Sequence, residues 1–67
     1  MYNATLVVER VDGFALVPVA EINAGTYDRA GIAKEAGFRA AFKHNMDENF
    51  LKRYGADIVR FKVNRAY

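Results

Sequence analysis

The N-terminal third of the chain holds two apolar runs rich in β-branched residues, and their pattern predicts a β-hairpin. The runs cover residues 4–11 and 14–22, with Asp12-Gly13 between them. An Asp-Gly pair in this place favours a two-residue type I′ turn, because both central residues of that turn need a positive φ. The cross-strand pairs expected from this turn are Val11 with Phe14, Glu9 with Leu16, Val8 with Val17, and Leu6 with Val19.

Side chains in such a hairpin alternate between two faces. One face is apolar and is the expected core face: Leu6, Val8, Val17 and Val19, with Ala4 and Ala15. The other face mixes apolar and polar groups: Thr5, Val7, Glu9, Val11, Phe14, Leu16 and Pro18. If helices cover only the first face, part of this mixed face stays exposed to solvent.

Pro18 has no backbone N–H to donate, which places the second run at the edge of a sheet. The first run is then central and needs another partner. The best candidate is residues 57–65, where Val59, Phe61 and Val63 alternate with Arg60, Lys62 and Asn64. We expect a three-stranded, antiparallel-type sheet with the spatial order 2-1-3.

Residues 27–54 form the expected helical region. Thr26 is the expected N-cap, with Asp28 in the first turn, where a carboxylate suits the helix dipole. On a helical projection five residues share an arc that is expected to pack on the sheet: Tyr27, Ala30, Phe38, Ala41 and Phe42. An unbroken helix over this range would be about 42 Å long, which is too long for so small a domain.

The helical region therefore contains at least one break. Gly37 is a candidate C′ residue that ends a first helix, and a break at residues 44–47 is favoured over it. Asp47 is the expected N-cap of a short second helix over residues 48–54, which Gly55 ends. Whether the region forms one, two or three helices is left open. The pattern as a whole predicts one α+β domain of residues 1–67, in the order β-β-α-(α)-β, with its helices on one face.

Composition adds few constraints. The 67 residues carry a formal charge of +2 and contain no cysteine, which fits a reducing compartment. The basic excess is much weaker than the clustered charge of dedicated nucleic-acid binders. No apolar run is long enough for a membrane span, and Met1-Tyr2-Asn3 does not start a signal peptide. We expect a soluble, cytoplasmic protein that does not engage a membrane.

Residues suited to catalysis are scarce. The chain has no serine, and its glycines do not form a phosphate-binding loop after a strand. His44 is the one histidine, and Asp47 and Glu48 stand three and four residues after it. These residues span the expected helix break, and neither a cysteine nor a second histidine completes a site. We expect no enzymatic activity, no cofactor and no metal, and we interpret His44 as a surface residue near a helix end.

Two surfaces are candidates for binding. On the mixed sheet face, an apolar centre with a charged rim is typical of protein-binding sites, and the candidate residues are Val7, Glu9, Phe14, Leu16, Arg60 and Lys62. Tyr2 and Tyr67 are candidate aromatic anchors there. The alternative is a basic stripe on the outer helix faces that would bind nucleic acid: Arg29, Arg39, Lys43, Lys52 and Arg53.

The strands also resemble a known family. Ala4-Thr5 leading to Glu9, Phe14 followed by residues 17–21, and residues 60–62 resemble the small inhibitors of bacterial RNA polymerase made by T7-type phages. In that family an acidic residue of the first strand and two basic residues of the last strand contribute to polymerase binding. By position the resemblance assigns these roles to Glu9, Arg60 and Lys62.

Together, the mixed sheet face and the resemblance favour a non-enzymatic inhibitor or regulator that blocks a host protein or complex in the host cytoplasm. RNA polymerase and a defence complex are the candidate partners. The alternative is a small basic nucleic-acid-binding protein that uses the helical stripe. A homodimer is also left open.

Overall fold

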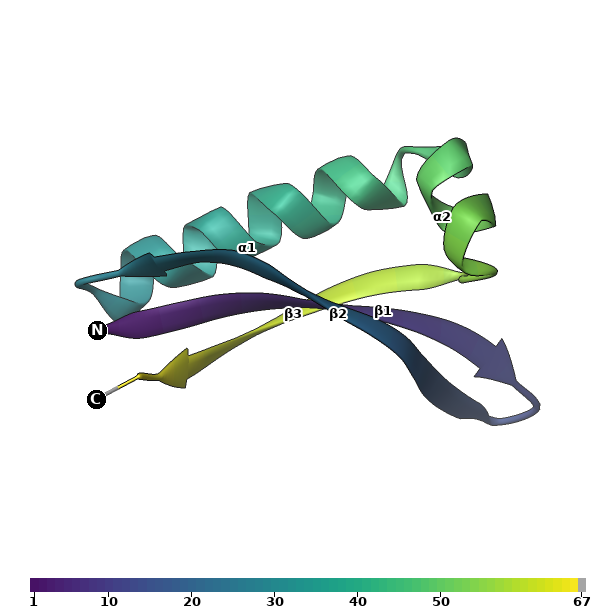
Figure 1. Ribbon diagram of the computed structural model, residues 1–67, viewed down its shortest axis with the longest axis horizontal. Helices are drawn as coiled ribbons and strands as arrows, with labels where there is room; N and C mark the ends of the chain where they lie inside the picture. The colour runs from purple at the N-terminus through teal and green to yellow at the C-terminus, as the bar shows by residue number, and fades with distance from the viewer. Residues whose placement is uncertain (67) are drawn as a thin grey trace.

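Three strands and two helices make up the computed structural model, which describes residues 1–66 (Figure 1). In chain order they are β1 (Tyr2–Asp12), β2 (Ala15–Tyr27), α1 (Ala30–Asn45), α2 (Glu48–Tyr54) and β3 (Ile58–Arg65). The strands form one antiparallel sheet in the order β2-β1-β3. The α+β class, the strand order and the edge position of β2 are therefore confirmed. The long helix α1 crosses one face of the sheet (Figure 1) and contacts all three strands.

The core lies between α1 and alternate residues of the strands. Leu6 and Val8 of β1 are fully buried and stand opposite Phe61 and Val59 of β3. These side chains lie on the helix-covered face because residues two apart on a strand share a face. The predicted alternation of β3 is confirmed, with Val59 in the core and Arg60 and Lys62 exposed on the other face.

The hairpin turn lies one residue later than predicted. Val11 pairs with Leu16 and Asp12 with Ala15, so the two turn residues are Gly13 and Phe14. Gly13 has φ +64°, and no residue other than glycine has a positive φ in the described chain. A positive φ at the first turn position alone matches a type II′ turn, which needs glycine there and nowhere else. The type I′ turn and the register expected from it are therefore wrong.

A bulge then shifts the register again. Glu9 pairs with Pro18 and Val8 with Ala20, which leaves Val19 as the extra residue of β2. An extra residue changes which side chains of a strand face the core. The residues opposite Val8 and Leu6 are consequently Ala20 and Ile22, and not Val17 and Val19 as predicted.

The second strand runs further than expected. It ends at Tyr27, and Thr26 lies inside it, where its hydroxyl donates to Asn3 Oδ1 at 2.7 Å. The prediction of Thr26 as a helix N-cap is therefore wrong, because this hydroxyl already has a partner across the hairpin. The helix α1 begins at Ala30 after Arg29, which provides no side-chain cap.

Small residues form the buried face of α1. Its buried positions are Ala33, Gly37 and Ala41, whereas Phe38 and Phe42 are 59% and 60% exposed. A Cβ built on Gly37 would come within 2.7 Å of Phe61 Cδ2, so the helix backbone packs directly on β3 at this point. The prediction that Phe38 and Phe42 pack under the helix is wrong, because this close approach leaves room only for small side chains. Gly37 does not end a helix either, since α1 continues to Asn45.

The short helix α2 matches its prediction. The Asp47 carboxylate accepts hydrogen bonds from the backbone N–H groups of Asn49 and Phe50, at 3.1 and 3.2 Å. Gly55 ends the helix in the left-handed conformation with φ +61°. The helical region thus consists of two helices separated by a break at residues 46–47.

Candidate functional site

The face of the sheet opposite α1 carries no helix (Figure 1) and is here called the open face. Val7 lies at its centre on β1, opposite Glu21 of β2 and Arg60 of β3. Thr5 is the next β1 residue on this face, and it stands opposite Asn23 and Lys62. The structure therefore brings Val7, Arg60 and Lys62 together, as the sequence predicted.

Glu9 and Arg60 form a two-point ion pair on this face. Arg60 Nε donates to Glu9 Oε1, and Arg60 Nη2 donates to Glu9 Oε2 at 3.0 Å. The Glu9 side chain is 5% exposed and that of Arg60 is 57% exposed. The hydrogen bond to Glu9, together with the negative charge of its carboxylate, raises the pKa of Arg60. Because Glu9 is buried and Arg60 is more than half exposed, Arg60 is the member of the pair that a binding partner would contact.

A second ion pair crosses the central strand. Lys62 Nζ of β3 lies 3.4 Å from Glu21 Oε2 of β2, and both side chains are about half exposed. Sequence reasoning did not include Glu21 in the site, because the unexpected bulge at Val19 decides on which face Glu21 lies. Exposed pairs of this kind contribute little to stability, so the Lys62 and Glu21 pair is not required to hold the sheet together.

The end of the hairpin extends past the three-stranded part of the sheet (Figure 1). The pairing of β1 with β3 stops at Glu9, so residues 10–17 form a two-stranded projection, here called the arm. Three of its apolar side chains are exposed: Val11, Phe14 and Leu16. Leu16 and Phe14 thus lie at the tip of the molecule, beyond the ion-paired centre of the open face. Tyr67, the other predicted anchor besides Tyr2, lies outside the described residues.

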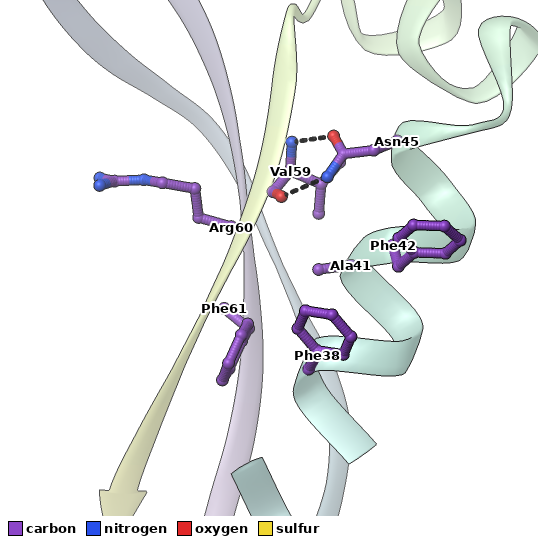
Figure 2. A pocket seen from close by; sticks show the side chains of 7 residues that line it. All are labelled: Phe38, Ala41, Phe42, Asn45, Val59, Arg60 and Phe61. Atoms are coloured by element: carbon purple, nitrogen blue, oxygen red, sulfur yellow. Dashed lines mark hydrogen bonds between the residues drawn. The ribbon is translucent and has the colours of Figure 1, made fainter. Parts of the chain in front are cut away.

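On the helix side, a groove separates α1 from β3 and is here called the α1–β3 groove. Its volume is about 360 Å³, and Figure 2 shows its lining residues: Phe38, Ala41, Phe42, Asn45, Val59, Arg60 and Phe61. The ring of Phe38 meets Phe61 edge to face, with centroids 6.4 Å apart, and stacks beside Phe42 at 6.3 Å. Sequence reasoning missed this site because it assigned both helical phenylalanines to the core. The sequence did contain a signal: Phe38 and Phe42 are four residues apart, and the small residues Gly37 and Ala41 stand directly before them.

The basic residues of the alternative site are spread over both helices. Arg39 is paired with Glu35 at 2.7 Å, one turn earlier on α1. Lys52 and Arg53 lie in the last turn of α2, whose first residue, Glu48, and N-cap, Asp47, are acidic. All five of the predicted residues are exposed: Arg29, Arg39, Lys43, Lys52 and Arg53. No single groove or strand gathers them within the described chain, and nucleic-acid binding stays a prediction.

His44 stacks on a neighbouring aromatic ring. Its ring centroid lies 4.1 Å from that of Phe50, with the planes 25° apart, so the imidazole helps to join α1 to α2. Asp47 is engaged as the N-cap of α2. Within residues 1–66, no group of three metal-ligating side chains is assembled. No helix in this part of the chain has the length and apolar character required to cross a membrane.

Comparison of the chain with known protein families, with curated protein sequences and with solved structures finds no match. The resemblance to the phage polymerase inhibitors therefore stays a prediction based on short strand motifs.

Proposed function

We propose that this chain is a non-enzymatic protein-binding inhibitor or regulator that docks a host protein through the open face and the arm. The observation that carries the proposal is the continuity of the two regions. The exposed apolar side chains of the arm, Val11 and Leu16, pair with each other two positions beyond the Glu9 and Pro18 pair, and residues two apart on a strand share a face. An apolar patch beside ion-paired polar groups has the make-up of a protein interface.

The exposed basic groups of the open face can pair with acidic groups of a partner. Arg60 and Lys62 reach solvent, while Glu9 is buried beneath Arg60. A partner carboxylate would therefore meet Arg60 or Lys62, and not Glu9. By the family resemblance, bacterial RNA polymerase is the first candidate partner, and a host defence complex is the second.

The test is affinity capture with two variants matched in charge change. Leu16→Asp combined with Lys62→Glu alters the proposed site, and Ile32→Asp combined with Lys43→Glu makes the same kinds of change on α1. All four side chains are exposed, so both variants should fold with an unchanged circular dichroism spectrum. We expect wild type and the α1 variant, but not the site variant, to retain a bacterial protein from nuclease-treated lysate. Purified RNA polymerase is tested in parallel.

Two results would contradict this proposal. In the first, the site variant captures the same nuclease-resistant partner as wild type, which removes the open face and arm from the interface. In the second, capture by wild type disappears after nuclease treatment, and the variant that carries Lys43→Glu captures nothing even without nuclease. That result favours nucleic-acid binding through the helical stripe. A gel shift that weakens steeply with salt would support that alternative directly.

A further inference from the structure

Within residues 1–66, no other strand pairs with the outer edge of β3. β3 is an edge strand. In an antiparallel strand, one residue directs its N–H and C=O groups at the neighbouring strand, and the next residue directs both groups away from it. The side chain of Asn45 identifies the outward residues. It accepts from Val59 N–H at 2.7 Å and donates to Val59 C=O at 2.8 Å, as a neighbouring strand would (Figure 2). By alternation, Phe61 and Val63 also direct their N–H and C=O groups outward.

The α1–β3 groove runs beside this open edge. Because Asn45 reaches the outer edge of β3, the same side of α1 overhangs that edge. Phe42 and Phe38 lie about one and two helical turns before Asn45 on this side, and both are exposed. A strand added next to Phe61 and Val63 would place alternate side chains against the two phenylalanine rings. The edge and the groove therefore offer hydrogen bonds and apolar contacts to the same extended segment.

The charged residues of β3 are all basic, and two of them, Arg60 and Lys62, pair with Glu9 of β1 and Glu21 of β2. Arg60 and Lys62 project from β3 on the open-face side, and Figure 2 shows Arg60 pointing away from α1. Arg65 follows them on β3, and Lys34 lies one turn before Phe38 on α1. Among the described residues, neither Lys34 nor Arg65 has an ion-pair partner. An incoming strand thus meets the phenylalanine rings on the helix side, where Arg65 and Lys34 also lie, and Lys62 on the open-face side.

We infer that the outer edge of β3 binds an extended segment of a partner protein in which apolar or aromatic residues alternate with acidic ones. The segment becomes a fourth strand beside residues 61–65, with its apolar side chains in the α1–β3 groove and its acidic side chains near Lys62. This is β-strand addition, in which main-chain bonds supply affinity and alternate side chains supply specificity. Asn45 ends the site, because it already occupies the outward groups of Val59.

A second copy of the chain fits this edge poorly. β3 contains Arg60, Lys62 and Arg65 and no acidic residue, so antiparallel pairing of two β3 strands would place cations near cations. Like charges directly opposite each other destabilise a strand pair. Charge complementarity therefore favours an acidic partner strand over a homodimer.

The test uses a fluorescent peptide, capped at both ends, in which glutamate alternates with phenylalanine and valine. Two derivatives carry N-methyl groups on alternate amides, one on the odd and one on the even positions. Because a strand directs alternate amides to opposite edges, only one derivative should lose affinity, by about tenfold or more. Binding should also perturb the amide resonances of Phe61 and Val63. Replacing glutamate by lysine in the peptide should weaken binding by a similar factor.

Protein variants separate this site from the open face. Phe38→Ala should weaken peptide binding, whereas Ile32→Ala removes an exposed apolar side chain of the same helix outside the groove and should not. Leu16→Asp on its own, without the Lys62→Glu change that would affect both sites, should leave peptide binding intact and abolish capture of the host protein, so that this inference and the proposed function fail independently. Equal binding of both N-methylated peptides, or no binding of the parent peptide, overturns the inference. Concentration-dependent dimerisation that Val63→Pro abolishes would also overturn it, by assigning the edge to a second copy.

Discussion

The body of the domain and the arm use apolar residues in opposite ways. In the body, α1 covers Leu6 and Val8, which lie in the core with Val59. In the arm, Val11, Phe14 and Leu16 are exposed. Leu6, Val8 and Val11 belong to the same strand, β1, so β propensity does not distinguish the two regions. The difference lies in what covers each region: α1 buries the apolar residues of the body, which therefore stabilise the fold, whereas nothing in the described chain covers those of the arm.

Leu6→Ala should have the largest effect on stability. Leu6 is 1% exposed at the centre of the core, and truncating a buried leucine costs about 2–5 kcal/mol through lost burial and the cavity left behind. Since a domain of this size is only marginally stable, we expect the variant to be largely unfolded at room temperature. Urea or thermal denaturation followed by circular dichroism measures the effect. A loss below about 1 kcal/mol would mean that the core does not centre on Leu6.

The tightness of packing in the body can be tested with two glycines of one helix. Gly37→Ala should destabilise the domain by about 1–3 kcal/mol, because its Cβ would clash with Phe61. This loss should occur although alanine favours a helix over glycine by about 1 kcal/mol. Gly31 of the same helix has open space around it, with nothing within 4 Å of the position that a Cβ would take, so Gly31→Ala should be neutral or stabilising. Equal effects at both positions would show that α1 does not pack closely on β3.

Sequence patterns predicted the parts of the fold that depend on local chemistry. The alternation in β3, the Asp47 cap and the Gly55 helix end all depend on neighbours in the chain, and all three are present. Pro18 correctly indicated an edge strand because the missing N–H is a property of that residue alone.

The errors concern features that tertiary packing decides. The bulge at Val19 turns Ala20 and Ile22 toward the core; the neighbouring Pro18 is compatible with an edge strand or with a bulge, and only the edge strand was inferred from it. Phe38 and Phe42 were expected in the core because large apolar residues normally are buried, but the contact between Gly37 and Phe61 excludes them. The α1–β3 groove exists because of that same contact, so it was not predictable without the three-dimensional structure.

The smallest loss of stability is expected in the arm, where a leucine can be replaced by alanine as in the core. Leu16→Ala removes the same atoms as Leu6→Ala, but Leu16 is 42% exposed and lies outside the core cluster. Its cost should stay below about 1 kcal/mol, because a partly exposed side chain loses little burial and leaves no closed cavity. The measurement is the same urea denaturation, run side by side for both variants. If Leu16→Ala costs as much as Leu6→Ala, the arm is part of the folded core, and its apolar residues are not free to bind a partner. If the two costs differ as expected, any loss of partner binding in arm variants can be attributed to the interface and not to unfolding.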